Sequence, residues 1–473
     1  MIRIILILST FLLNLFLCNA QEKVYTLEDC IAIAFENNLD LKGSHLNADA
    51  ARVDLNRSWG DITPAVNASY ELGITDGRSI DPYTNDYIDQ ELTYSTAALS
   101  LSATVFNGFK LKNTIKQSRQ NLNASEMEIA EAKQDLRLKV TLAYLQILNT
   151  RDQLTLAKSR LEVTGQQVDR LEVLYQQEVG NPADYTDMKG QFSSDQMAVL
   201  TAENNLKAAI INLFLLMGVE TELDADFQNT AASLKFELYP ISSEDVYEES
   251  LANLPTFKAK ELRQEAAESG VSIAIADYFP RISLFGGLFT NYSSAAEVFN
   301  QTGTNTVNTG SYVNINGTDY DVFADQAIFS SEKISYGDQF NNNLNTSYGV
   351  SVNIPLFNGA RARNNVKISK IELESAENEL KQTKLSYKKS IEQAYINMET
   401  AYDKFLVLQD QVKAYEESFR VNEIRFNSGV SNIVEYIIAK NNVDSSRLNL
   451  SIAQYEYVLR TLVLDYYRGS FDM

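Results

Sequence analysis

Few residues of this chain have the type and spacing that catalysis or metal binding requires. The single histidine of the 473 residues, His45, lies in a polar helical stretch without other His or Cys nearby, so it is interpreted as a solvated surface side chain. After residue 20 the only cysteine is Cys30, which can form neither an internal disulfide nor a thiolate metal site. The sequence also lacks a Gly-rich phosphate loop and a Gly-x-Ser-x-Gly elbow. We therefore expect no catalytic site, no metal and no cofactor.

The overall charge of the chain is strongly acidic. Its formal net charge of −21 argues against nucleic acid as a partner, because nucleic-acid binders usually carry a basic patch. Proline is rare, at 7 residues, which permits long uninterrupted secondary structure. No stretch after residue 20 has the ~20 consecutive apolar residues of a membrane helix. If the mature chain crosses a membrane, strands must do so.

Residues 1–20, MIRIILILSTFLLNLFLCNA, have the pattern of a secretory signal peptide cut before Gln21. Cys18 and Ala20 supply small side chains near the cut. A single membrane anchor is the alternative, although the apolar run is short for a span and polar residues interrupt it. Lipidation at Cys18 is a minor alternative, because Leu17 stands where lipoprotein signals usually have a small residue.

The tripeptide Phe-Asn-Gly occurs twice, at 106–108 and at 357–359, and marks an internal repeat with an offset of 251 residues. The same offset relates Ala143-Tyr144 to Ala394-Tyr395 and Tyr185 to Tyr436, without a gap. Upstream the offset is 216, as Pro64 and Pro280 show. The chain is therefore two copies of one unit, and the second copy carries 35 extra residues, since 251 − 216 is 35.

The extra residues fall in a stretch rich in Asn, Thr, Gly and Ser, which we interpret as an enlarged loop over about 293–344. The first copy manages without these residues, so the loop is expected to be dispensable for folding. Deletion of residues 298–317 should then leave assembly intact.

Long helices with apolar heptads dominate each copy and predict coiled-coil hairpins. Each long arm has about 70 residues, which at 1.5 Å per residue is about 105 Å. In both copies the heptad phase shifts by four residues at the same place, from Ala143 to Ile147 and from Ala394 to Met398. Such a shift locally unwinds a left-handed coiled coil.

Alternation of apolar and small polar residues predicts four strands, two per copy. It is clear in AVNASYELGIT after Pro64 and less regular in RISLFGGLFTNY, where Phe285 and Phe289 fall on the polar side. An ordinary half-buried strand alternates too. The lengths nevertheless fit membrane strands, and an open sheet has unsatisfied edges that lipid cannot accommodate. Four strands in lipid therefore require several chains to close one barrel, and three chains would supply twelve strands.

These patterns predict an α+β membrane protein with a two-fold internal repeat, long coiled-coil helices and four amphipathic strands per chain; that the helices form an α-helical barrel is implied only by the family resemblance described next. The first repeat, 21–239, should have helices at about 26–60, 109–178 and 183–217 and strands at about 65–75 and 95–106. The second repeat, 240–473, should have helices at about 242–277, 360–428 and 433–467 and strands at about 281–292 and 346–357.

Over residues 24–468 the chain resembles the outer membrane efflux protein family, the TolC-like channel-tunnels. The resemblance rests on the paired repeat, the helix-to-strand entry ADYFP at 276–280, the strand exit PLFNG at 355–359 and the stretch RFNSGVSNIVEYIIAKN at 425–441. It implies a homotrimer with a 12-stranded outer-membrane barrel continuous with a periplasmic helical barrel. The implied activity is passive export, with a periplasmic adaptor and an inner-membrane pump as partners and outer-membrane lipid as surroundings.

The resemblance also assigns roles to particular residues. Acidic residues after the tip turns would ring a periplasmic aperture; in this chain they are Asp184, Asp187 and Glu435. The family's second acidic position falls on Ile438, and no Arg follows Gly429. The two aspartates are equally well explained as acids favoured by a helix N-terminus. The tip turns for adaptor docking would be Gly180, Asn181, Gly429, Val430 and Ser431, and the strand–helix junctions would use Pro64, Gly108, Pro280, Pro355 and Gly359.

Two other classes of function compete with an export duct. Heptads also fit a structural coiled-coil protein of the cell surface, but the amphipathic strand pairs do not. A closed porin-like uptake channel is disfavoured by the presence of only four strands per chain.

Overall fold

The computed structural model describes residues 24–81, 85–179, 181–229 and 236–470. The predicted signal peptide and Gly180 lie outside the described residues. The chain divides into two compact units. The helical unit comprises Met1–Val53, Arg119–Ala267 and Glu372–Met473, and the strand unit comprises Asp54–Ser118 and Glu268–Ile371.

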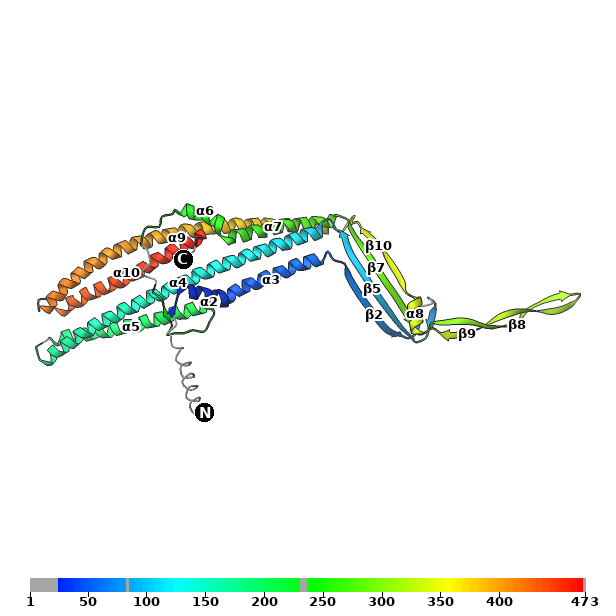
Figure 1. The fold of residues 1–473 in the computed structure, drawn as a ribbon, viewed down its shortest axis with the longest axis horizontal. Helices are drawn as coiled ribbons and strands as arrows, with labels where there is room; N and C mark the ends of the chain where they lie inside the picture. Colours follow the sequence, from blue (N-terminus) through cyan, green and yellow to red (C-terminus); the bar gives the residue numbers. More distant parts are fainter. Residues whose placement is uncertain (1–23, 82–84, 180, 230–235, 471–473) are drawn as a thin grey trace, which may run out of the picture. The chain divides into compact units, whose positions relative to one another are not determined.

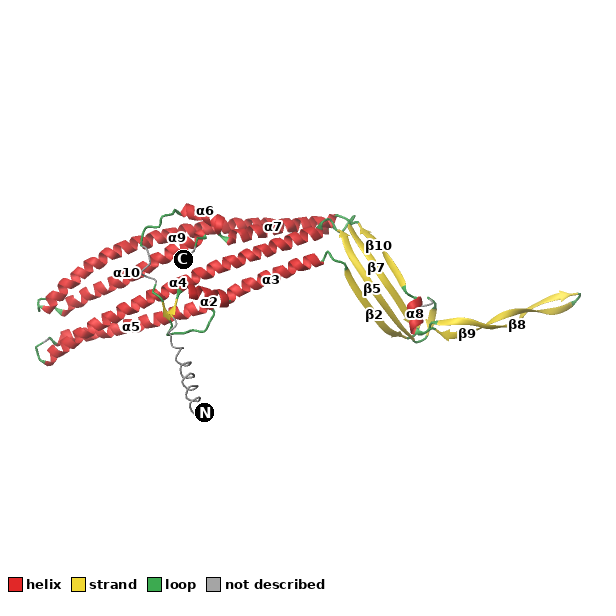
Figure 2. Cartoon of the chain, in the orientation of Figure 1, coloured by secondary structure: helices red, strands yellow, loops and turns green. Residues whose placement is uncertain are grey.

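Eight long or medium helices carry most of the described chain (Figures 1 and 2). They are α2 (Leu27–Asn37), α3 (Leu39–Gly60), α4 (Lys110–Gln176), α5 (Pro182–Met217), α6 (Ser243–Asn253), α7 (Pro255–Ile275), α9 (Arg361–Asn427) and α10 (Ile433–Arg468). Within the helical unit α5 runs back along α4, and α10 runs back along α9 (Figure 1). These two pairs are the coiled-coil hairpins that the heptads indicate.

The first helix of each repeat is interrupted, so the predictions of single helices over 26–60 and 242–277 are wrong. The breaks fall at Asn38 and Leu254, which are equivalent at the 216-residue offset and both have extended backbone. Leu254 precedes Pro255, and a residue before proline is disfavoured in the α conformation. Asn38 starts α3 instead, because its Oδ1 accepts hydrogen bonds from the backbone N–H groups of Asp40 and Leu41, both at 3.0 Å.

The largest core of the helical unit forms where the heptad phase shifts. Ala143, Tyr144 and Ile147 are buried there together with side chains of α2, α5 and α10. The Tyr144 hydroxyl lies 3.1 and 2.8 Å from the carbonyl oxygens of Tyr25 and Gln228. These carbonyls flank a short parallel pair that the sequence did not predict, β1 (Val24–Tyr25) with β6 (Asp226–Phe227). The phase shift thus lets α4 bury two successive faces at the level where extra elements cover it.

Helix α5 is long and apolar enough to cross a membrane by length and composition alone. However, its last apolar turns are buried in the same core, where Ile210, Leu213, Phe214 and Met217 pack. Core packing therefore accounts for part of the apolar composition of α5, since a third of the apolar window is buried.

The strand unit contains a four-stranded antiparallel sheet in the order β10-β7-β5-β2. Its strands are β2 (Ala65–Thr75), β5 (Leu92–Phe106), β7 (Arg281–Ser293) and β10 (Asn345–Asn353). Strand β10 ends four residues before the predicted end at 357, since Pro355 has no N–H to donate to a ladder. Both β2 and β10 have one unpaired edge in the single chain.

The interpretation of residues 293–344 as a loop is wrong. Two long strands, β8 (Glu297–Ile315) and β9 (Thr318–Lys333), form a hairpin, and α8 (Tyr336–Asn342) follows it. The hairpin turns at Asn316-Gly317, whose φ angles are 55° and 86°. An Asn-Gly pair with both φ angles positive suits a two-residue hairpin turn, whose twist matches that of the strands. Among the described residues at this place, the first repeat has the short pair β3 (Arg78–Ile80) and β4 (Tyr87–Asp89).

The hairpin also changes the deletion that tests whether the insert is dispensable. Removing residues 298–317 would delete β8 and leave β9 without a partner. Removing Glu297–Lys333 is cleaner, because the Ile334 N–H already donates to the Ala296 carbonyl at 3.1 Å. We expect this variant to assemble with unchanged yield and melting temperature, as measured by size-exclusion chromatography and thermal denaturation in detergent. Loss of assembly would show that the insert is structural.

Candidate functional site

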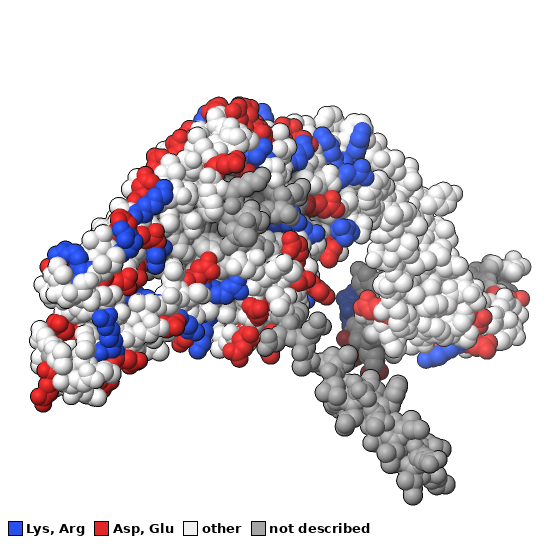
Figure 3. Space-filling view, turned by 60° about the vertical axis from the view of Figure 1, so that its left-hand side comes forward, with Lys and Arg blue, Asp and Glu red and all other residues white. Residues whose placement is uncertain are grey.

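The register of the sheet sorts its side chains onto two chemically different faces. Directly paired residues share a face, so the pairs Ala68↔Leu99, Leu99↔Leu288 and Leu284↔Val350 place aliphatic side chains from all four strands together. The opposite face carries mostly Ser, Thr, Asn and Gly. The only charged residues in the four strands are Glu71 and Arg281. The sheet accordingly forms a surface almost free of red and blue in Figure 3.

Aromatic residues on the polar face lie over glycines. Phe285 occupies the space that a Cβ of Gly349 would need, at 2.7 Å, and Tyr94 does the same at Gly73, at 2.6 Å. The outer atoms of each ring thus occupy the space beside a glycine of a neighbouring strand, where no side chain stands. This packing explains how Phe285 fits on a face of small residues, where the sequence pattern placed it irregularly.

The repeated Phe-Asn-Gly builds the same strand-to-helix turn twice. Gly108 and Phe109 have φ angles of 68° and 66°, and their counterparts Gly359 and Ala360 have 64° and 63°. Two successive residues in the left-handed region reverse the chain sharply before the helix starts. Glycine adopts this conformation without the steric cost that a Cβ brings. The other predicted junction residues lie beside strands: Pro64 precedes β2, Pro280 precedes β7, and Pro355 follows β10.

A cavity of about 780 Å³ lies at these turns within the strand unit. Its lining pairs equivalent residues of the two repeats: Thr104 with Pro355, Asn107 with Asn358, Lys110 with Arg361, Leu111 with Ala362, Thr114 with Asn365, and Asp61 with Asp277. Arg281 and Asn353, which pair on the polar face of the sheet, also line it. The cavity is therefore on the polar side of the sheet.

Asp277 ties the two long helices together at this cavity. Lys110 Nζ donates to its Oδ1 at 2.8 Å, and Asn365 Nδ2 donates to its Oδ2 at 3.2 Å. Partial burial alone would raise the pKa of Asp277, but these two partners outweigh it and hold the pKa below its ordinary value. The carboxylate thus stays charged and links the starts of α4 and α9.

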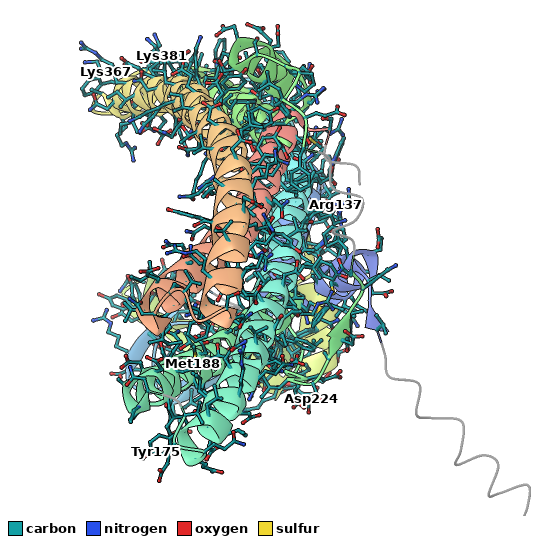
Figure 4. The ribbon with its side chains drawn as sticks, turned by 90° about the vertical axis from the view of Figure 1, so that its left-hand side faces the viewer. Arg137, Tyr175, Met188, Asp224, Lys367 and Lys381 are labelled. Atoms are coloured by element: carbon teal, nitrogen blue, oxygen red, sulfur yellow. The ribbon has the colours of Figure 1, made fainter. Side chains whose placement is uncertain are left out.

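The tip turns of both helical hairpins lie at one end of the helical unit. Leu171 and Met188 of the first hairpin are buried with Ile433 and Tyr436 of the second. Figure 4 shows Tyr175 and Met188 at this end. Phe419 and Phe426 contact the Tyr436 ring, with centroids 5.5 and 4.9 Å away. Burial, with lesser contributions from nearby charges, raises the pKa of Tyr436 to about 12, so its ring stays neutral.

Asp184 and Glu435 lie on the first turns of the return helices and Asp187 on the second turn of α5, and the three acids have different surroundings. Asp187 is exposed, and Asp184 accepts a hydrogen bond from Asn181 Nδ2 at 3.2 Å. Glu435 is exposed and has Arg425 at 3.7 Å. Asn181 and Asn432 are helix caps, and Gly429 has a φ of 72° in the second turn, next to Val430 and Ser431.

A buried ionic network that the sequence did not indicate joins the two hairpins above the tips. Asp195 of α5 is fully buried, 2.7 Å from Arg160 Nε of α4 and 3.8 Å from Lys440 Nζ of α10. Lys440, only 2 % exposed, pairs with Asp444 at 2.7 Å. Thr164 donates to Asp195 at 2.5 Å. The sequence contains one indication of this network. Lys440 is a charged residue four residues after Tyr436, at a heptad position that normally faces a neighbouring helix.

The network is two cations against two carboxylates and is therefore electrically balanced. Polar side chains complete it: Gln191 donates to Asp195 at 2.9 Å, and Arg160 donates to the Asn441 amide oxygen at 2.7 Å. In the described part of the chain no group of three or more His, Cys, Asp or Glu residues could hold a metal ion.

Together, a sheet with one aliphatic and one polar face and paired helical hairpins define the class of outer-membrane channel-tunnels. The model of the outer membrane efflux protein family matches residues 30–219 and 246–467, which follow the two repeats. The chain belongs to the outer membrane efflux protein family.

Individual relatives are distant but match over nearly the whole length. The outer membrane protein TolC of Vibrio cholerae is 23% identical over 435 residues, covering 91% of this chain and 87% of the relative. The toxin and drug export protein A of Aggregatibacter actinomycetemcomitans is 24% identical over 445 residues, covering 90% and 82%.

Solved structures show the same fold. CusC has a TM-score of 0.75 at 19% identity and covers 94% of this chain and 92% of its own. The CmeC outer membrane channel of Campylobacter jejuni has a TM-score of 0.75 at 15% identity, covering 94% and 86%. The family is one of efflux channels, so the predictions of an outer-membrane transport protein without enzymatic activity are confirmed.

Proposed function

We propose that three copies of this chain form one passive exit duct across the outer membrane. The observation that carries the proposal is the four-stranded sheet, with an aliphatic face, a polar face and two unpaired edges, β2 and β10. Pairing β10 of one copy with β2 of the next would satisfy both edges and close twelve strands. The aliphatic faces would then meet lipid, and the polar faces would line the water-filled lumen.

The tip turns are the proposed docking points for a periplasmic adaptor, which would connect the duct to an inner-membrane pump. They combine exposed turn residues with a rigid base, because the aromatic cluster at Tyr436 fixes both hairpin ends. The names of relatives support a role in drug or toxin export. The alternative function is that of a structural coiled-coil protein of the cell surface. That function does not explain why one face of the sheet is aliphatic.

Native mass spectrometry in detergent tests the assembly, and an export assay tests the function. A trimer is expected, and a folded monomer would overturn the architecture. In cells lacking their outer-membrane efflux channel, this chain with its adaptor and pump should restore dye efflux. A membrane-inserted trimer that restores none would support the structural alternative.

Neutralising the tip acids should weaken cation selectivity. We expect the variant Asp184→Asn, Asp187→Asn, Glu435→Gln to lose part of its cation preference and of its block by multivalent cations, because a carboxylate ring attracts cations. Arg425 beside Glu435 already offsets part of that charge, so the two aspartates should account for most of the change. Reversal potentials in planar bilayers measure it.

The matched control removes three exposed acids elsewhere on the helices, with Asp40→Asn, Glu248→Gln and Glu374→Gln. It should keep the wild-type selectivity. If the tip variant also keeps it, the acids are ordinary helix-start residues and the constriction lies elsewhere.

A further inference from the structure

The starts of both long helices carry a basic stripe that the export function does not explain. Lys112 and Lys116 of α4 are equivalent to Arg363 and Lys367 of α9 at the 251-residue offset, and Lys370 extends the second stripe by one turn. All five side chains are exposed. Figure 4 shows Lys367 projecting away from α9. We call these five residues the basic belt.

Few acidic residues lie beside the belt in the sequence, and the first after Lys370 are Glu372 and Glu374. Residues 107–125 and 354–371 contain no Asp or Glu, and among the residues that the structure describes none of the five cations forms an ion pair. Helix N-termini favour anions and disfavour cations, so an external anion beside Lys112 and Arg363, on the first turns of α4 and α9, would be stabilising.

The side of the helix on which the belt lies follows from the junction cavity. Lys110 and Arg361 line that cavity on the polar side of the sheet. Lys112 and Lys116 come two and six residues after Lys110, which at 3.6 residues per turn is the opposite side of the helix. The same spacing puts Arg363, Lys367 and Lys370 opposite Arg361. The belt therefore lies on the side of the aliphatic face.

We propose that the basic belt binds the phosphate groups of phospholipids where the helices leave the membrane. This inference rests on the proposed membrane position of the sheet. The belt begins within two residues of the helix starts, and α4 itself begins four residues after β5 ends. Long Lys and Arg side chains reach back toward a membrane surface. Clusters of four to eight cations beside a membrane segment have the charge that anionic headgroups require.

Lipid retention by the purified full-length chain tests the proposal. The belt variant carries Lys112→Gln, Lys116→Gln, Arg363→Gln, Lys367→Gln and Lys370→Gln. Its control carries five changes of exposed lysines elsewhere on the helices: Lys42→Gln, Lys133→Gln, Lys207→Gln, Lys381→Gln and Lys389→Gln. Each protein is mixed with phosphatidylglycerol or phosphatidylcholine in detergent, and bound lipid is counted by native mass spectrometry.

The belt variant should retain phosphatidylglycerol about tenfold less than wild type or control, and the difference should shrink as salt increases. Phosphatidylcholine retention should be equal in all three proteins. Equal phosphatidylglycerol retention by belt variant and control would overturn the proposal. An excess of inorganic phosphate that displaces the lipid completely would show a free-phosphate site instead.

The outcome is separable from that of the proposed function, because lipid is counted on whatever species the protein forms. A trimer that exports but shows no belt effect would refute only the belt. A monomer that binds phosphatidylglycerol through the belt would refute only the duct.

Discussion

Replacing Asp195 by Asn should lower the stability of the helical unit by about 3 kcal/mol or more, since it leaves the buried Lys440 and the partly buried Arg160 with one carboxylate. Asp195 is fully buried and faces Arg160 and Lys440 from two different helices. The asparagine keeps the size of the side chain, so the effect measures charge and not a cavity. The network joins α10 to the α4–α5 hairpin, so the variant should also melt at a lower temperature. The two hairpins would then be held together less firmly, and we expect more current through the variant in planar bilayers.

Two further variants separate a specific network from general damage. Glu203→Gln removes the acid of an exposed pair on the same helix, 3.4 Å from Lys158, and should change little. Adding Lys440→Met to Asp195→Asn restores charge balance, leaving Arg160 with Asp444 at 3.4 Å. The double variant should recover part of the lost stability. If it is less stable than Asp195→Asn alone, the network is not held by the balance of its charges.

The parts of the fold that can be predicted well are those encoded by a repeated or periodic sequence pattern. The constant 251-residue offset brings the two Phe-Asn-Gly turns into equivalent conformations at Gly108 and Gly359. The heptads mark the stripe that each helix buries, since burial is what keeps those positions apolar. Strand alternation predicts the two faces of the sheet without the register, because successive side chains point to opposite sides.

Features that depend on the local chemistry of one residue, or on contacts between distant segments, are not indicated by a periodic sequence pattern. The break at Asn38 arises from a side-chain cap within an otherwise helical pattern. The hairpin turn at Asn316-Gly317 was hidden by a composition typical of loops. Lys440 matches Lys189 at the repeat offset, yet Lys440 is buried and Lys189 is exposed. Lys440 has Asp444 on its own helix as one partner, but its second partner, Asp195, comes from α5.

The two junction glycines allow a matched test of how the repeats differ. Gly108→Ala should be more destabilising than Gly359→Ala, although both have nearly the same positive φ. At Gly359 a Cβ would meet nothing within 4 Å, so only the cost of the left-handed backbone remains, about 1 kcal/mol. At Gly108 a Cβ would also lie 2.7 Å from Phe279 Cβ and 2.9 Å from the Ala276 carbonyl oxygen.

Those two atoms belong to the turn that enters β7, so relief of the clash must move backbone between α7 and the sheet. Overpacking of this kind adds about 1–3 kcal/mol, for a total of about 2–4 kcal/mol at Gly108. Melting temperatures of the purified assembly in detergent, compared between the two variants, measure the difference. Equal decreases in melting temperature would mean that the turn at Phe279 moves aside without an energetic cost. Glycine would then be required at the two junctions only by the backbone conformation, which is the same in both repeats.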